Sequence, residues 1–123
     1  GLVEACCQAM WTGEHILLIS SDVMYPHPLS DIRPMGSNFA VAMVLKAAAT
    51  DDALAKLTLG YAAESETRME PSELDELRLS NPSARCLPLL QVIAQKALHS
   101  DRAAAKKIHL EYVEPVSLEV VVD

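Results

Sequence analysis

The stretch GLVEACCQAMWTGEHILLIS, residues 1–20, decides the fold. It predicts a helix over Leu2–Thr12, because the polar side chains recur every four residues and form one narrow stripe. These side chains are Glu4, Gln8 and Thr12. A helix that is apolar on its other sides needs cover over most of its surface. Gly13 then suits the left-handed conformation that ends a helix.

Two continuous apolar runs follow this helix and predict strands that are buried on both faces. The first runs from Ile16 to about Ser21, and the second covers Phe39–Leu45. The connection Asp22–Asn38 is long, and the prolines of its segments Tyr25–Pro28 and Arg33–Gly36 exclude regular structure there, so we expect a surface or interface loop. Two such strands beside such a helix predict an α/β layered fold with helices above and below the sheet.

The second half of the chain predicts a third strand, two helices and a terminal strand pair. We expect a strand at Leu57–Tyr61 and a short surface helix at Pro71–Leu77, in which Leu74 and Leu77 point inward. A turn or helix start at Asn81–Ser83, a helix at Leu87–Leu98 and a polar connection at Ser100–Lys107 follow. Alternation places Ile108, Leu110 and Tyr112 on one face of a strand, and Val116, Leu118, Val120 and Val122 on one face of the next. Glu114–Pro115 joins these two strands as an antiparallel pair. The acidic run Glu64–Glu76 predicts a solvated face.

Composition excludes several classes of protein. The 123 residues suffice for one small domain, and 50% are hydrophobic, which is typical of a globular chain. The net charge of −7, without a basic stripe, argues against a nucleic-acid partner. No apolar run approaches the roughly 18 residues of a membrane span. Three cysteines, of which two are adjacent, are not a disulfide framework, so we expect a reducing cytoplasm.

The chain enters its most apolar helix directly at Leu2, without an initiating Met. We therefore expect residues 1–123 to be a single partial domain, the C-terminal piece of a longer polypeptide. A second fragment of that polypeptide is expected to stay bound, because exposing each large apolar side chain of the helix would cost about 1.5–3 kcal/mol.

The residues that could carry chemistry form no complete catalytic set. Cys6 and Cys7 lie in an apolar helix with no cation nearby in the sequence, so we expect small hydrophobes rather than nucleophiles. The histidines have no metal-ligand spacing, and we expect no metal. They are His15, His27, His99 and His109. The four glycines form no phosphate-binding loop, so no nucleotide cofactor is expected.

Several motifs resemble the β-ketoacyl synthase branch of the thiolase fold. Cys7-Gln8-Ala9 and Gly13-Glu14 are similar in content and spacing to the helix behind the nucleophile of those enzymes. The closer resemblance is to the chain length factors of bacterial aryl polyene and related type II polyketide or fatty-acid synthases. It rests on Tyr25-Pro26-x-Pro28-Leu29, Arg33-Pro34, Asn38-Phe39-Ala40-Val41-Ala42, Asn81-Pro82-x-Ala84-Arg85 and Leu87-Pro88-Leu89-Leu90, and it covers residues 1–48 and 81–93.

This resemblance implies the C-terminal part of a thiolase-like layered fold, with a mixed sheet and buried helices. It also implies a non-catalytic subunit, because the nucleophile position falls before Gly1 and nothing here resembles the glycine-rich histidine loops of active ketosynthases. Such a subunit pairs with a catalytic ketosynthase, which does most of the docking of the acyl carrier protein. The resemblance further implies that the opening helix lines or backs the acyl cavity through Ala5, Cys6, Ala9 and Met10.

Two other interpretations stay open at this point. The chain could be a piece of an active ketosynthase or thiolase-like acyltransferase whose nucleophile lies upstream, or a small interaction module unrelated to thiolases. The four cavity-wall residues could equally be ordinary core, since apolar helical stripes are usually core.

Overall fold

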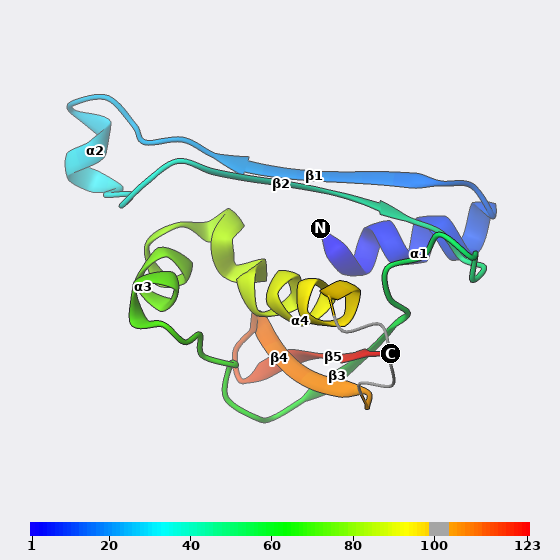
Figure 1. The fold of residues 1–123 in the computed structure, drawn as a ribbon. Helices are drawn as coiled ribbons and strands as arrows, with labels where there is room; N and C mark the ends of the chain where they lie inside the picture. Colours follow the sequence, from blue (N-terminus) through cyan, green and yellow to red (C-terminus); the bar gives the residue numbers. More distant parts are fainter. Residues whose placement is uncertain (99–103) are drawn as a thin grey trace.

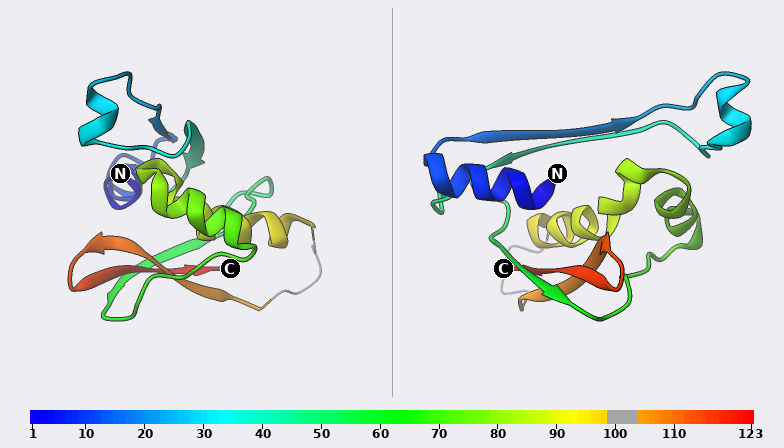
Figure 2. Two further views of the ribbon diagram at one scale, coloured as in Figure 1. Left: turned by 90° about the vertical axis from the view of Figure 1, so that its left-hand side faces the viewer. Right: turned by 180° about the vertical axis from the view of Figure 1, so that it is seen from behind.

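The computed structural model describes residues 1–98 and 104–123, which form a mixed α/β fold with two small antiparallel sheets (Figure 1). The elements are α1 (Leu2–Thr12), β1 (Ile16–Asp22), α2 (Leu29–Ile32), β2 (Phe39–Leu45), β3 (Leu57–Ala62), α3 (Ser72–Ser80), the 3₁₀ helix η1 (Pro82–Cys86), α4 (Leu87–Leu98), β4 (Lys106–Val113) and β5 (Val116–Val122). Helices α1 and α4 lie between the β1–β2 ribbon and the three-stranded sheet (Figures 1 and 2). The described residues thus form an α/β fold with two antiparallel sheets, whereas the sequence predicts one sheet with helices above and below it.

The first sheet is a long two-stranded ribbon. β1 and β2 pair in an unbroken antiparallel register from Ile16↔Leu45 to Asp22↔Phe39. Burial alternates along both strands, because one face packs on α1 and the η1 region while the other is open. The expected burial on both faces is wrong within this structure, since Leu17 is 60% exposed and Ile19 is 63% exposed.

Helix α1 has the predicted bounds, and Gly13 ends it in the left-handed conformation with φ 71°. Its amide donates to the carbonyl of Ala9 across 2.9 Å. Only Ala5 and Ala9 are buried in this helix. The expected cover on most sides is absent among the described residues, because Met10 is 76% exposed and Trp11 is 91% exposed.

The main core lies between α4 and the second sheet, whose order is β3-β5-β4. Leu89 and Val92 of α4 pack there against alternate residues of the last two strands, Ile108, Leu110, Leu118, Val120 and Val122. Pro88 sits in the first turn of α4, where its missing donor is tolerated. The predicted antiparallel pairing of β4 with β5 is confirmed.

Two details of the second half differ from expectation. The register of β4 shifts between Leu110 and Val113, so Tyr112 leaves the buried face and its ring lies 5.3 Å from that of Tyr61. Residues 100–103 of the expected polar connection Ser100–Lys107 lie outside the described residues, and Lys106 and Lys107 already belong to β4. In the ribbon connection, the one-turn helix α2 lies between the two proline segments, Tyr25–Pro28 and Arg33–Gly36, in which we expected no regular structure.

None of the described helices is long and apolar enough to cross a membrane.

Candidate functional site

Large exposed apolar side chains concentrate in the first 45 residues. Nine of the sixteen such side chains among the described residues belong to α1, the ribbon and the loop that joins its strands. We call these nine the N-terminal apolar surface: Met10, Trp11, Leu17, Ile19, Val23, Met24, Leu29, Ile32 and Val44. Their exposed fractions range from 53% to 91%. Exposed apolar surface on this scale is typical of a region that another protein covers.

The ribbon also lacks the features that protect a free sheet edge from other strands. Its outward face carries Leu17, Ile19 and Ser21 from β1 and Ala40, Ala42 and Val44 from β2, with no charge. Neither strand contains a lysine, a proline or a bulge. In the second sheet, β4 has lysines at its start and a register shift near its end. This contrast supports the ribbon as a surface that a partner covers.

A polar junction anchors the ribbon to η1. The Asp22 carboxylate accepts the amide N–H of Ser83 at 2.8 Å and its hydroxyl at 2.5 Å. The Ser20 and Ser83 hydroxyl oxygens lie 2.8 Å apart. Because these residues are 61 to 63 positions apart in the sequence, the junction fixes the far end of β1 against η1.

Asn81 completes this junction. Its buried side-chain oxygen accepts the amides of Ser83 and Ala84, which caps η1, and its amide nitrogen donates to the Ser37 carbonyl at 2.8 Å. Gly36 passes close by, since a Cβ there would lie 2.6 Å from the Ser80 hydroxyl oxygen. The sequence signals the cap through Asn81-Pro82-Ser83, but no local signal reveals its ribbon partners.

The four residues expected to line an acyl cavity do not share one environment. Ala5 and Ala9 are 5% and 2% exposed, on a helix that packs against both ribbon strands. Ala5 also lines a depression between α1 and β1, together with Glu4, Gln8 and Ile16–Ile19. Cys6 is half-buried, whereas Met10 points to solvent.

The candidate nucleophiles and ligands show no activating surroundings in the described part of the chain. Partial burial raises the pKa of the Cys6 thiol, and the adjacent Cys7 raises it further, which disfavours a reactive thiolate. Burial likewise raises the pKa of Cys86. No group of three or more potential metal ligands occurs among the described residues.

The histidines lie apart from one another. His15 is exposed, and His27 Nδ1 lies 3.1 Å from the Asp31 carboxylate on the open surface. His109 Nε2 lies 3.4 Å from Glu119 on the second sheet. His99 lies outside the described residues. The structure therefore does not gather His15, His27 and His109 into one site.

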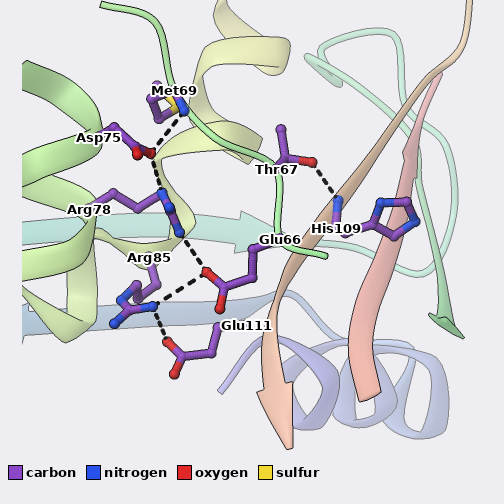
Figure 3. A network of polar contacts seen from close by, with 8 residues as sticks. All are labelled: Glu66, Thr67, Met69, Asp75, Arg78, Arg85, His109 and Glu111. Carbon is purple, nitrogen blue, oxygen red and sulfur yellow. Dashed lines mark hydrogen bonds and ion pairs between the residues drawn. The ribbon is translucent and has the colours of Figure 1, made fainter. Parts of the chain in front are cut away.

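The acidic run is not simply a solvated face. Glu66 and Asp75 hold Arg78, which is only 4% exposed, and Arg85 joins Glu66 to Glu111 (Figure 3). The expectation of a solvated face is wrong for these two acids, because the sequence gives no sign that an arginine on α3 is buried between them.

Scans of protein-family models, curated proteins and solved structures find no match to this chain. The geometry itself offers an exposed apolar surface, built on α1 and the ribbon, of the kind that is typical of protein-binding regions.

Proposed function

We propose that this chain is part of a non-catalytic chain length factor, which pairs with a β-ketoacyl synthase and shapes its acyl cavity in aryl polyene, polyketide or fatty-acid-type biosynthesis. The observation that carries the pairing is the N-terminal apolar surface, in which Trp11 is 91% exposed and Ile32 is 79% exposed. The residue motifs that resemble chain length factors supply the identity of the partner.

The junction motifs add support from a second direction. Asn81 belongs to a motif on which the resemblance rests, and it holds the ribbon connection in place by donating to the Ser37 carbonyl. A thiolase-like layered arrangement, of which these residues form the C-terminal part, follows from the same proposal. All three cysteines are free, which suits a reducing cytoplasm.

The proposal divides the N-terminal apolar surface between two occupants. Another segment of the same polypeptide covers part of α1, and the ketosynthase covers the remainder of the surface, including Trp11. The acyl carrier protein docks mainly on the ketosynthase, because carrier proteins are typically acidic and this chain has a net charge of −7.

Native purification from the source cells tests this function. The full polypeptide that contains this chain would carry an affinity tag, and mass spectrometry would identify every co-purifying chain. We expect a nearly equimolar condensing enzyme of the thiolase fold. An acyl thioester probe should label this enzyme at a cysteine.

Two outcomes would contradict the proposal. Acyl labelling of the tagged polypeptide itself would instead favour a piece of an active ketosynthase. A folded monomer with no condensing enzyme bound would favour an unrelated interaction module.

Substitutions in α1 show whether its apolar residues line the acyl cavity or belong to the ordinary core. Ala9→Phe is expected to lower the free energy of unfolding by about 1–3 kcal/mol, because Ala9 is 2% exposed in packed surroundings. Met10→Trp is expected to leave the stability of the free chain nearly unchanged, because Met10 is 76% exposed, and to shorten the product of the complex. Melting temperature and product length would be measured together. An unchanged product distribution with Met10→Trp would exclude Met10 from the cavity wall.

A further inference from the structure

The outer edge of β4 is closed by a segment that belongs to neither sheet. β4 pairs with β5 on one side only, because it is an edge strand in the order β3-β5-β4. On its other side, the Thr67 amide donates to the His109 carbonyl at 2.8 Å, and the His109 amide donates to the Thr67 hydroxyl at 2.9 Å. Residues 63–70, which we call the strap, therefore occupy the edge in the manner of an added strand.

The strap is held mainly by charge. Glu66 Oε2 accepts hydrogen bonds from Arg78 at 2.5 Å and from Arg85 at 3.4 Å (Figure 3). Asp75 Oδ1 accepts Arg78 Nε at 2.7 Å and the Met69 amide at 2.9 Å. Three of these contacts tie the strap to α3 and η1, and the fourth, between Arg78 and Asp75, lies within α3.

Apolar packing contributes less to holding the strap. Its one large buried apolar side chain is Met69, at 4% exposed, and Glu64, Arg68 and Glu70 are exposed. The core cluster beneath it consists of residues from α4, β4 and β5. A segment with few apolar contacts and a few polar attachments opens at a lower free energy than the core does.

We infer that the strap detaches from β4 as one unit while the core stays folded, and that the Glu66–Arg78 ion pair is the main contact that keeps the strap closed. Closed, the strap fills the edge of β4 with the chain's own backbone. Open, it uncovers the amide and carbonyl of His109, which lie on the one side of β4 that β5 leaves free.

Limited trypsin digestion of the full chain tests the role of the Glu66–Arg78 ion pair, because Arg68 is an exposed cleavage site within the strap. Glu66→Gln removes the negative charge from the Glu66–Arg78 ion pair. Glu70→Gln is the matched control, because it makes the same chemical change in the same segment at an exposed position. Cleavage rates after Arg68 would be divided by those of peptides spanning residues 60–75 with the same substitution. This division removes the direct effect of either glutamate on the protease.

Glu66→Gln is expected to raise the normalised rate about tenfold or more, because the hydrogen bond from Arg78 then ends on a neutral amide oxygen instead of a carboxylate. The rate after Lys56, beside β3, should change less than twofold, as should both rates in Glu70→Gln. An equal rise after Lys56 would indicate general unfolding and overturn the inference. No rise after Arg68 would overturn it as well.

Hydrogen exchange on the unsubstituted chain tests the inference even if Glu66→Gln folds poorly. The amides of Thr67, Met69 and His109 should lose protection together, at least tenfold faster than those of Val120 and Val122 in the buried strand β5. Exchange of all five amides at one common rate would show that the strap opens only with the core.

Discussion

Arg78→Ala is expected to lower the free energy of unfolding by about 3 kcal/mol, because it leaves two carboxylates without the cation that they share. Arg78 is 4% exposed, and its guanidinium lies 2.5 Å from Glu66 and 2.7 Å from Asp75. Arg68→Ala is the matched control, since Arg68 is exposed and should tolerate the change within about 0.5 kcal/mol. Urea titration followed by circular dichroism measures both. Equal stability of the two variants would show that the buried ion pairs contribute nothing net.

The Asp75–Arg78 ion pair also predicts how the free energy of unfolding depends on pH. The hydrogen bond from Arg78, helped by the Met69 amide, lowers the pKa of Asp75 below its ordinary value. A carboxylate whose pKa is lowered by folding stabilises the native state fully above its unfolded pKa, about 3.9. That contribution is lost as the pH falls from there through the lower, folded pKa.

Arg78→Ala should therefore differ most from the unsubstituted chain near neutral pH, and the difference should shrink as the pH falls below about 4. Urea titrations of both chains at pH 7, 5 and 3 provide the comparison. A difference that stays constant or grows in acid would contradict this role for Asp75.

Local patterns predict the helices and strands of this chain well. The bounds of the helices Leu2–Thr12 and Leu87–Leu98 follow from their side-chain periodicity, and those of the strand Phe39–Leu45 follow from a continuous apolar run. Gly13 and Pro88 lie where helix termini favour them. These signals act within one or two helical turns, so the sequence alone contains them. The third strand and the terminal strand pair follow from alternation in the same way.

Contacts between distant residues could not be predicted in this way. Asp22 and Ser83 are 61 positions apart, and neither is distinctive until both are seen to bond. The burial of Arg78 between two acids is hidden within a run that resembles a solvated helix face. A continuous apolar run such as Ile16–Ile19 predicts a strand, but it does not say whether the cover comes from this chain or from another protein.

The exposed side chain of Trp11 tests whether another protein covers this region. If the N-terminal apolar surface binds the ketosynthase, Trp11→Lys should weaken the complex about 30-fold or more, because buried interface tryptophans often contribute 2 kcal/mol or more. The free chain should change in stability by less than about 0.5 kcal/mol, since Trp11 is 91% exposed in it. Dissociation constants would be measured with the condensing enzyme that co-purifies from the source cells.

Ile19→Lys and Val113→Lys extend this comparison to the two sheets. Ile19 is 63% exposed on β1 and Val113 is 66% exposed on β4, so the two substitutions replace apolar side chains of similar exposure in the free chain. Only the first should weaken the complex, because β4 has a register shift and lysines that the ribbon lacks. If Val113→Lys weakened binding as much as Ile19→Lys, the partner would cover the second sheet instead. If Trp11→Lys and Ile19→Lys both left binding intact, another segment of the same polypeptide would be the sole occupant of this surface.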